Sequence, residues 1–119
     1  MVKKRGRCEI IFPIVLFLPL VSRDSYKIMI RILHTADWHL GQTFFGYDRT
    51  GEHEVFLNWL AEEIRQKEID ALIIAGDVFD VSNPSAASQS MYYQFIYRVT
   101  VENPNLQIVI VAGNHDSAA

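Results

Sequence analysis

The stretch ALIIAGDVFD, residues 71–80, consists of a short apolar run followed by a glycine and two aspartates. An aliphatic run of this length, closed by a glycine, is typical of a buried β-strand. Gly76 permits a tight turn at the strand end, and the Asp77 carboxylate can bridge two cations because its oxygens bind in different directions. We interpret Asp80 as a group that orients a ligand or a loop rather than as a ligand itself. Turn and capping roles are also common for such aspartates, so this stretch by itself predicts only the strand.

Strand-like and helix-like patterns alternate on both sides of this stretch. Residues 30–36 and 106–112 have the composition of two more buried strands. Apolar residues recur at helical spacing between the strands, at Val55, Phe56, Trp59, Leu60 and Ile64, and again at Met91, Tyr92, Phe95, Ile96 and Val99. The first helix is expected over about 52–67. The second is expected to begin at Asn83 and Pro84, where the missing N–H of proline costs nothing. This order predicts an α/β fold, a βαβαβ unit with parallel strands and right-handed crossovers.

The composition limits the class of protein. A chain of 119 residues with 50% hydrophobic content is long enough for one domain with a core. The net charge is −3, but the part of the chain from Met29 onward contains five basic and twelve acidic residues. This balance gives no support to a nucleic-acid partner, whereas acidic groups that hold cations would explain part of the excess. The single Cys8 excludes an internal disulfide and a cysteine-based metal site.

The first 28 residues differ from the rest of the chain. Four basic residues among the first seven precede the apolar run IIFPIVLFLPLV, residues 10–21, which is the order found in an export signal. The run is shorter than the ~20 apolar residues that span a bilayer, and two prolines interrupt it. We therefore expect residues 1–28 to be an extension outside the fold and residues 29–119 to form a cytoplasmic domain. A membrane-associating or exported chain is the alternative.

Polar clusters follow all three predicted strands. Asp37 and His39 come after the first, Asp77 and Asp80 after the second, and Gly-Asn-His-Asp, residues 113–116, after the third. In extended backbone, residues two apart point to the same side, so Asp37 and His39 can share a cation. Ligands bind beyond the carboxyl ends of parallel strands. The three clusters together therefore predict a site, although each alone is weak evidence.

The third cluster adds an amide, an imidazole and a carboxylate. The Asn114 oxygen suits a hard divalent cation, and His115 can donate a proton or stabilise charge on a phosphate. Asp116 can fix the tautomer of that histidine through a hydrogen bond. Taken singly, however, Asn-His-Asp could also be a turn.

The combination Asp-x-His, Gly-Asp-x-x-Asp and Gly-Asn-His-Asp resembles the calcineurin-like metallophosphoesterases. Within that superfamily the strings ILHTADWHLGQ, GEHEVFLNWL, IDALIIAGDVFDVSNPS and IVIVAGNHDS are similar to the start of the SbcD-type nuclease subunits of bacterial double-strand-break repair complexes. The resemblance covers Met29 to Ala119. It implies a partial metallophosphoesterase sandwich and an exonuclease and endonuclease that acts on DNA in repair, recombination and replication. It also implies an SMC-like ATPase partner, allows a homodimer and requires no organic cofactor.

The same resemblance implies roles for individual residues. Asp37 and His39 would bind the first of two manganese ions, Asp77 would bridge both and Asn114 would bind the second. His115 would then be the catalytic histidine, with Asp116 beside it. The family's site is completed by three further histidines from two later motifs, which this sequence does not contain.

Two histidines outside the motifs do not replace those ligands. His34 lies inside the first predicted strand and His53 at the start of the first helix, and both are expected to be structural. We therefore expect the 119 residues alone to be a truncated, inactive portion of such a nuclease, with an apolar face left exposed. The alternatives are a fragment that binds only a metal or a partner and an enzyme for small phosphate esters.

Four aromatic residues lie in or near the first loop: Trp38, Phe44, Phe45 and Tyr47. Such rings can stack on nucleobases or rim a groove. Packing of the loop onto the domain is the expected role. Four scattered basic residues do not compensate for the acidic excess: Arg49, Arg65, Lys67 and Arg98. Those on the helices are expected to form a solvated surface rather than a track for phosphates.

Overall fold

The structure is a computed structural model that describes residues 14–21 and 27–113, with side chains from residue 30 onward. The elements, in chain order, are β1 (Ile14–Val21), β2 (Lys27–Thr35), β3 (Thr43–Phe44), β4 (Tyr47–Asp48), α1 (Thr50–Gln66), β5 (Ala71–Ala75), α2 (Ala86–Glu102) and β6 (Gln107–Val111). The three predicted strands and both predicted helices are therefore present.

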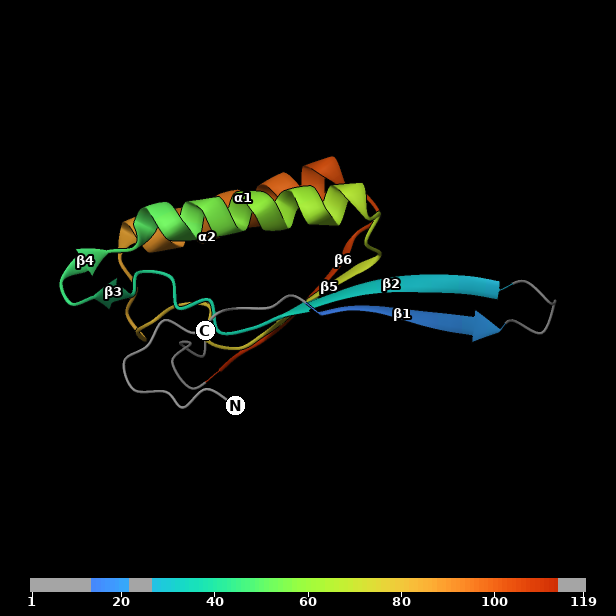
Figure 1. Ribbon diagram of the computed structural model, residues 1–119, viewed down its shortest axis with the longest axis horizontal. Helices are drawn as coiled ribbons and strands as arrows, with labels where there is room; N and C mark the ends of the chain where they lie inside the picture. The colour runs from blue at the N-terminus through green and yellow to red at the C-terminus, as the bar shows by residue number, and fades with distance from the viewer. Residues whose placement is uncertain (1–13, 22–26, 114–119) are drawn as a thin grey trace.

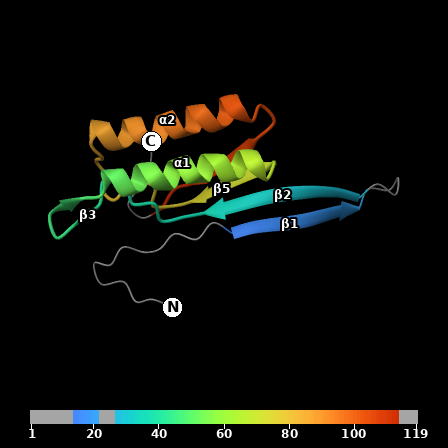
Figure 2. The same ribbon diagram turned by 45° about the horizontal axis from the view of Figure 1, so that its top comes forward.

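One four-stranded sheet, with the order β1-β2-β5-β6, forms the base of the molecule. Strands β2, β5 and β6 are parallel, and both helices lie on the same face of the sheet (Figures 1 and 2). Two crossovers that move in the same direction along a parallel sheet place their helices on one side when both are right-handed. The predicted βαβαβ unit is confirmed.

The core lies between this sheet and the two helices. Leu33 of β2 and Leu72 and Ile74 of β5 are completely buried on the helix side. Helix α1 contributes Leu60 and helix α2 contributes Val99, again with no exposed area. Each such side chain stabilises the fold by about 1.5–3 kcal/mol when it leaves water. The apolar stripes predicted from helical spacing therefore include the residues that hold the layers together.

The opposite face of the sheet has no helical cover among the described residues (Figure 1). The register pairs His34, Ile73 and Val109 across β2, β5 and β6, so these side chains share that face. Val109 and Val111 are 49% and 53% exposed. The exposed apolar face expected for half of a sandwich is thus present.

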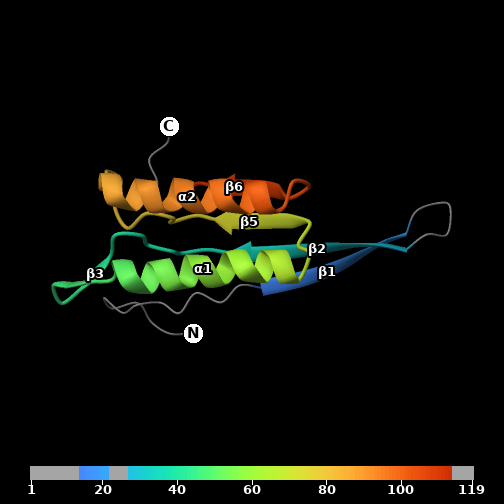
Figure 3. The ribbon, with the colours of Figure 1, turned by 90° about the horizontal axis from the view of Figure 1, so that it is seen from above.

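The sheet extends further toward the N-terminus than the sequence pattern predicts. Strand β1 pairs with β2 in an antiparallel register that runs from Ile14 opposite His34 to Val21 opposite Lys27. The β1–β2 pair projects beyond the ends of the helices (Figures 1 and 3). The domain boundary at residue 28 stays a prediction. Across the described part of the chain, no helix combines the length and apolar character that crossing a membrane requires.

The predicted start of the second helix is wrong by two residues. The N-cap of α2 is Ser85, whose hydroxyl accepts a hydrogen bond from the Ser88 N–H at 3.1 Å. Asn83 and Pro84 precede the helix instead of opening it. Asparagine and serine are both strong N-caps. Packing selects Ser85 as the N-cap, because the first turn of the helix is held by Ser88. Ser88 is buried, and its hydroxyl lies so close to Gly41 that an added Cβ there would be 2.7 Å away.

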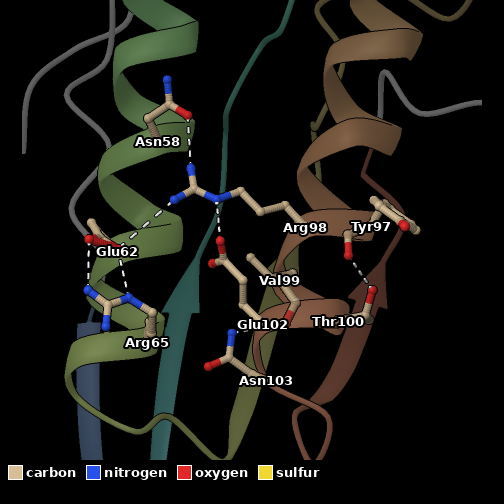
Figure 4. A network of polar contacts seen from close by, with 9 residues as sticks. All are labelled: Asn58, Glu62, Arg65, Tyr97, Arg98, Val99, Thr100, Glu102 and Asn103. Atoms are coloured by element: carbon tan, nitrogen blue, oxygen red, sulfur yellow. Dashed lines mark hydrogen bonds and ion pairs between the residues drawn. The ribbon is translucent and has the colours of Figure 1, made fainter.

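A polar network joins the two helices on their outer side (Figure 4). Arg98 of α2 donates to Asn58 of α1 at 3.0 Å and to Glu102 of its own helix at 3.0 Å. On α1, Arg65 donates to Glu62, and the hydrogen bond between them is the main cause of the lowered pKa of that carboxyl. Acidic neighbours thus engage these basic side chains, as expected for a solvated surface.

Candidate metal centre

The loops that follow β2 and β5 are bonded to each other as a continuation of the sheet. The Asp37 N–H donates to the Gly76 carbonyl at 3.1 Å, and the His39 N–H donates to the Asp77 carbonyl at 3.0 Å. A third bond, from the Leu40 N–H, extends this ladder by one residue. The relative positions of the two polar clusters are therefore fixed by backbone hydrogen bonds rather than by side-chain contacts.

Three residues of these loops have a left-handed backbone. The φ angles are 55° at Asp37, 49° at His39 and 50° at Asp77. Residues other than glycine rarely adopt this region, and each instance costs on the order of 1 kcal/mol or more. Such strain persists where the surrounding structure fixes it, and it gathers at functional sites. The extended backbone expected between Asp37 and His39 is therefore wrong, although the two side chains do meet.

The side chains of these same three residues form one cluster. Asp37, His39 and Asp77 each offer an atom for a cation, and these atoms all lie within 4.8 Å of one another. Nε2 of His39 lies 3.8 Å from Oδ1 of Asp37. The side chain of His39 is only 16% exposed, while that of Asp37 is 37% exposed, so the cluster opens to solvent on one side. Two carboxylates and an imidazole are a donor set that suits divalent transition metals.

Asp80 lies behind His39. Its Oδ1 atom is 3.3 Å from Nδ1 of the imidazole, on the ring edge away from Asp37. The position of Asp80 is held by its backbone, because its N–H donates to the Leu40 carbonyl at 3.1 Å. A carboxylate in this place can orient the imidazole toward the cluster.

The end of the third parallel strand reaches the same place. A Cβ added to Gly113 would lie 2.4 Å from both the backbone nitrogen and the Oδ1 atom of Asp77. Only glycine permits so close an approach of β6 to this aspartate. The predicted site residues Asn114, His115 and Asp116 follow directly in the sequence and lie outside the described residues.

The loop that carries Asp37 and His39 is anchored by the residue between them. Trp38 is 1% exposed and makes edge contacts with the rings of Phe56, Tyr92 and Phe95, at centroid distances of 5.9, 6.4 and 5.3 Å. Its indole N–H donates to the hydroxyl of Thr35 at 2.9 Å. The expected packing role is confirmed for Trp38. This anchoring explains how Asp37 and His39, on either side of Trp38, can keep a strained backbone conformation.

Histidines 34 and 53 do not join the cluster that the described residues form. His34 lies on the face of β2 opposite the helices, and His53 is 5% exposed near the start of α1. Burial, and then the charge of Arg49, lower the pKa of His53 below its ordinary value.

The basic residue that the sequence misjudges is Arg49. It is 8% exposed and bonds to Glu52 and to the Gln42 side chain rather than facing solvent. The sequence around Arg49 is a short loop of mostly polar residues, and this composition does not predict that the arginine is buried.

Comparison with known proteins agrees with the fold and the cluster. A family model of calcineurin-like phosphoesterases matches residues 30–119, and the chain belongs to this family. The chain is 46% identical over 89 residues to the SbcD subunit of the SbcCD nuclease from Escherichia coli K12. The proteins of the same name from Rhodobacter capsulatus and Bacillus subtilis are 51% and 41% identical over 88 and 87 residues. These matches cover 73–75% of the chain and 22% of each relative, so the chain spans about a fifth of their length.

Proposed function

We propose that this chain is the N-terminal portion of an SbcD-like DNA exonuclease and endonuclease that depends on manganese. The observation that carries the proposal is the cluster of Asp37, His39 and Asp77 at the carboxyl ends of two parallel strands. Membership of the calcineurin-like phosphoesterases supports hydrolysis of a phosphate ester, and the similarity to SbcCD nucleases supports DNA as the substrate.

The described residues fit a divalent cation. In the proposed site Asp37, His39 and Asp77 would hold one divalent cation, and Asp77 and Asn114 would hold a second. Cations bound in this way supply charge stabilisation to a phosphodiester and lower the pKa of water. Asp80 fixes the ring of His39, since its carboxylate lies 3.3 Å from Nδ1.

The remaining roles fall on the segment after Gly113. In the proposal His115 stabilises charge on the phosphate or donates a proton to the leaving oxygen, and Asp116 holds the tautomer of His115. The close approach of Gly113, which directly precedes Asn114 in the sequence, to Asp77 supports this assignment.

The complete protein, in this proposal, works in double-strand-break repair, recombination and replication, with an SMC-like ATPase and in a form that allows a homodimer. Residues 29–119 belong to the phosphoesterase domain, and residues 1–28 contribute no group to the site. We further propose that the 119 residues alone do not cleave DNA, because the described cluster contains a single imidazole.

The test compares the 119-residue chain with the complete gene product on linear duplex DNA in the presence of manganese. The complete protein is expected to cleave the DNA, and Asp37→Asn and Asn114→Ala are expected to abolish cleavage. Glu54→Gln is the matched control, since Glu54 is exposed on α1 and outside the cluster. Cleavage by the complete protein that survives Asp37→Asn would sink the proposed site. Robust cleavage by the 119-residue chain would refute its proposed inactivity.

A further inference from the structure

Strands β3 and β4 form a two-stranded hairpin with an unusual turn. Phe44 pairs with Tyr47, and the two residues between them, Phe45 and Gly46, have φ angles of 47° and 79°. Positive φ at both turn positions defines the turn type that suits a tight hairpin, and asparagine, aspartate or glycine is favoured at the first position. A phenylalanine there costs about 1–2 kcal/mol.

The residue that carries this strain gains almost no burial, because the side chain of Phe45 is largely exposed. Phe45 is 92% exposed, Tyr47 78% and Phe44 42%. The rings of Phe44 and Phe45 contact each other edge to face at 4.7 Å, but they do not reach the core. The sequence favoured packing for these residues as well as for Trp38. For Phe45 and Tyr47 that expectation is wrong.

The base of the hairpin is clamped. Arg49, directly after β4, donates to the Oε1 atom of Gln42, directly before β3, at 2.8 Å, so one side chain ties the two ends together. The same guanidinium donates to Glu52 of α1 at 2.8 and 2.9 Å. These hydrogen bonds connect the base of the hairpin, which carries the exposed aromatic rings, to the start of α1.

The hairpin lies beside the candidate metal centre. Gln42 donates its N–H to the carbonyl of His39 at 3.0 Å, one tight turn before β3 begins. In Figures 2 and 3 the hairpin protrudes at the end of the molecule toward which β2 and β5 run. A polymer with one phosphodiester at the cluster can extend toward this end of the molecule, where the hairpin lies.

We propose that Phe44, Phe45 and Tyr47 form a stacking platform for unpaired nucleobases of the strand whose phosphodiester is held at the cluster; this rests on the proposed function. Aromatic rings bind base faces with little dependence on sequence, at ~1–3 kcal/mol per stacked base. The guanidinium of Arg49 is occupied in the clamp, so the hairpin is built to contact bases rather than phosphates. Base faces are covered in a duplex, which makes frayed ends, loops and single strands the preferred substrates.

The first test measures binding of a single-stranded oligonucleotide that contains 2-aminopurine, by fluorescence, with the complete protein and no divalent cation. The variant Phe44→Ala/Phe45→Ala/Tyr47→Ala is expected to bind about tenfold more weakly, the loss of ~1.4 kcal/mol of stacking. The control Tyr93→Ala/Tyr97→Ala removes two exposed rings from α2 and is expected to bind as the parent does. Affinity of the hairpin variant within twofold of the parent would overturn the proposal.

The second test separates recognition from structure. Phe45→Asn places a favoured residue in the turn and is expected to raise the thermal midpoint while it weakens single-strand binding. A stabilised variant that binds as the parent does would exclude the platform. Hydrolysis of bis(p-nitrophenyl) phosphate by the complete protein requires the proposed metal site but no contact with a nucleobase, so it should not change in either hairpin variant. A matching loss there would mean that the hairpin only supports the site. If the parent protein hydrolyses neither linear duplex DNA nor bis(p-nitrophenyl) phosphate, the proposed nuclease activity is wrong. The binding assay would still decide the role of the hairpin.

Discussion

Replacement of Gly113 by alanine tests the contact that brings the third strand to the cluster. The new Cβ would lie 2.4 Å from the backbone nitrogen and from Oδ1 of Asp77, and 2.8 Å from its Cγ. Ordinary contacts are about 1 Å longer than this. Either the chain at Gly113 or the backbone of Asp77 must therefore move by about that amount, because rotation of the Asp77 side chain cannot relieve the contact with its backbone nitrogen.

The size of the effect follows from this displacement. Overpacking of a tight site costs about 1–3 kcal/mol, and for a domain of this length a loss of 2 kcal/mol lowers the thermal midpoint by about 10 °C. The displaced carboxylate also spoils the geometry of the cluster, where an error of about 1 Å can cost a hundredfold in rate. We therefore expect Gly113→Ala to lose both stability and manganese affinity.

The assay pairs this variant with Gly51→Ala. An added Cβ at Gly51 meets no atom within 4 Å, and the residue lies in α1, so alanine there should stabilise the chain by up to about 1 kcal/mol. Thermal unfolding and titration with manganese, followed by the electron paramagnetic resonance of the free ion, give the two readouts. Equal stability and equal manganese affinity for Gly113→Ala and the parent would refute the close approach of β6 to Asp77.

Three further predictions concern the support of the site. Trp38→Ala should cost about 3–5 kcal/mol in urea denaturation, because a completely buried indole is removed; a cost below 1 kcal/mol would contradict the anchoring of the loop. Ser85→Ala should cost about 1 kcal/mol while Asn83→Ala should cost little, and the reverse order would restore the predicted helix start. The pKa of His53 is lowered from 6.5, so the unfolded chain takes up this proton first. Stability is expected to fall as the pH drops from 6.5 toward the folded-state pKa, and His53→Gln should flatten that part of the profile.

Local patterns were sufficient for the layers of the fold. Helical spacing and short aliphatic runs are set by residues that are near in sequence, so α1, α2, β5 and β6 could be predicted to within a few residues. The residue at which α2 begins could not, since it depends on the contact of Ser88 with the loop at Gly41.

The candidate site was predictable in content but not in geometry. The residue types of Asp37, His39 and Asp77 and their places at strand ends indicated a cation site. Their left-handed backbone gave no signal, because all three are held in it by hydrogen bonds to the neighbouring loop and by the burial of Trp38. The burial of Arg49 and the exposure of Phe45 could not be predicted either. Both depend on a hairpin whose strands are two residues long, and strands this short leave almost no pattern in the sequence.

The ladder between the two loops also determines when the cluster can form during folding. Asp37 and Asp77 are brought together only after β2 and β5 have paired in register, which closes a loop of about 40 residues that includes α1. Such long-range pairing comes late relative to helix formation. We therefore expect a divalent cation to bind after the parallel sheet has formed, rather than to nucleate the fold. In a stopped-flow refolding experiment its capture would mark the completion of the parallel sheet, after the helical signal has already appeared.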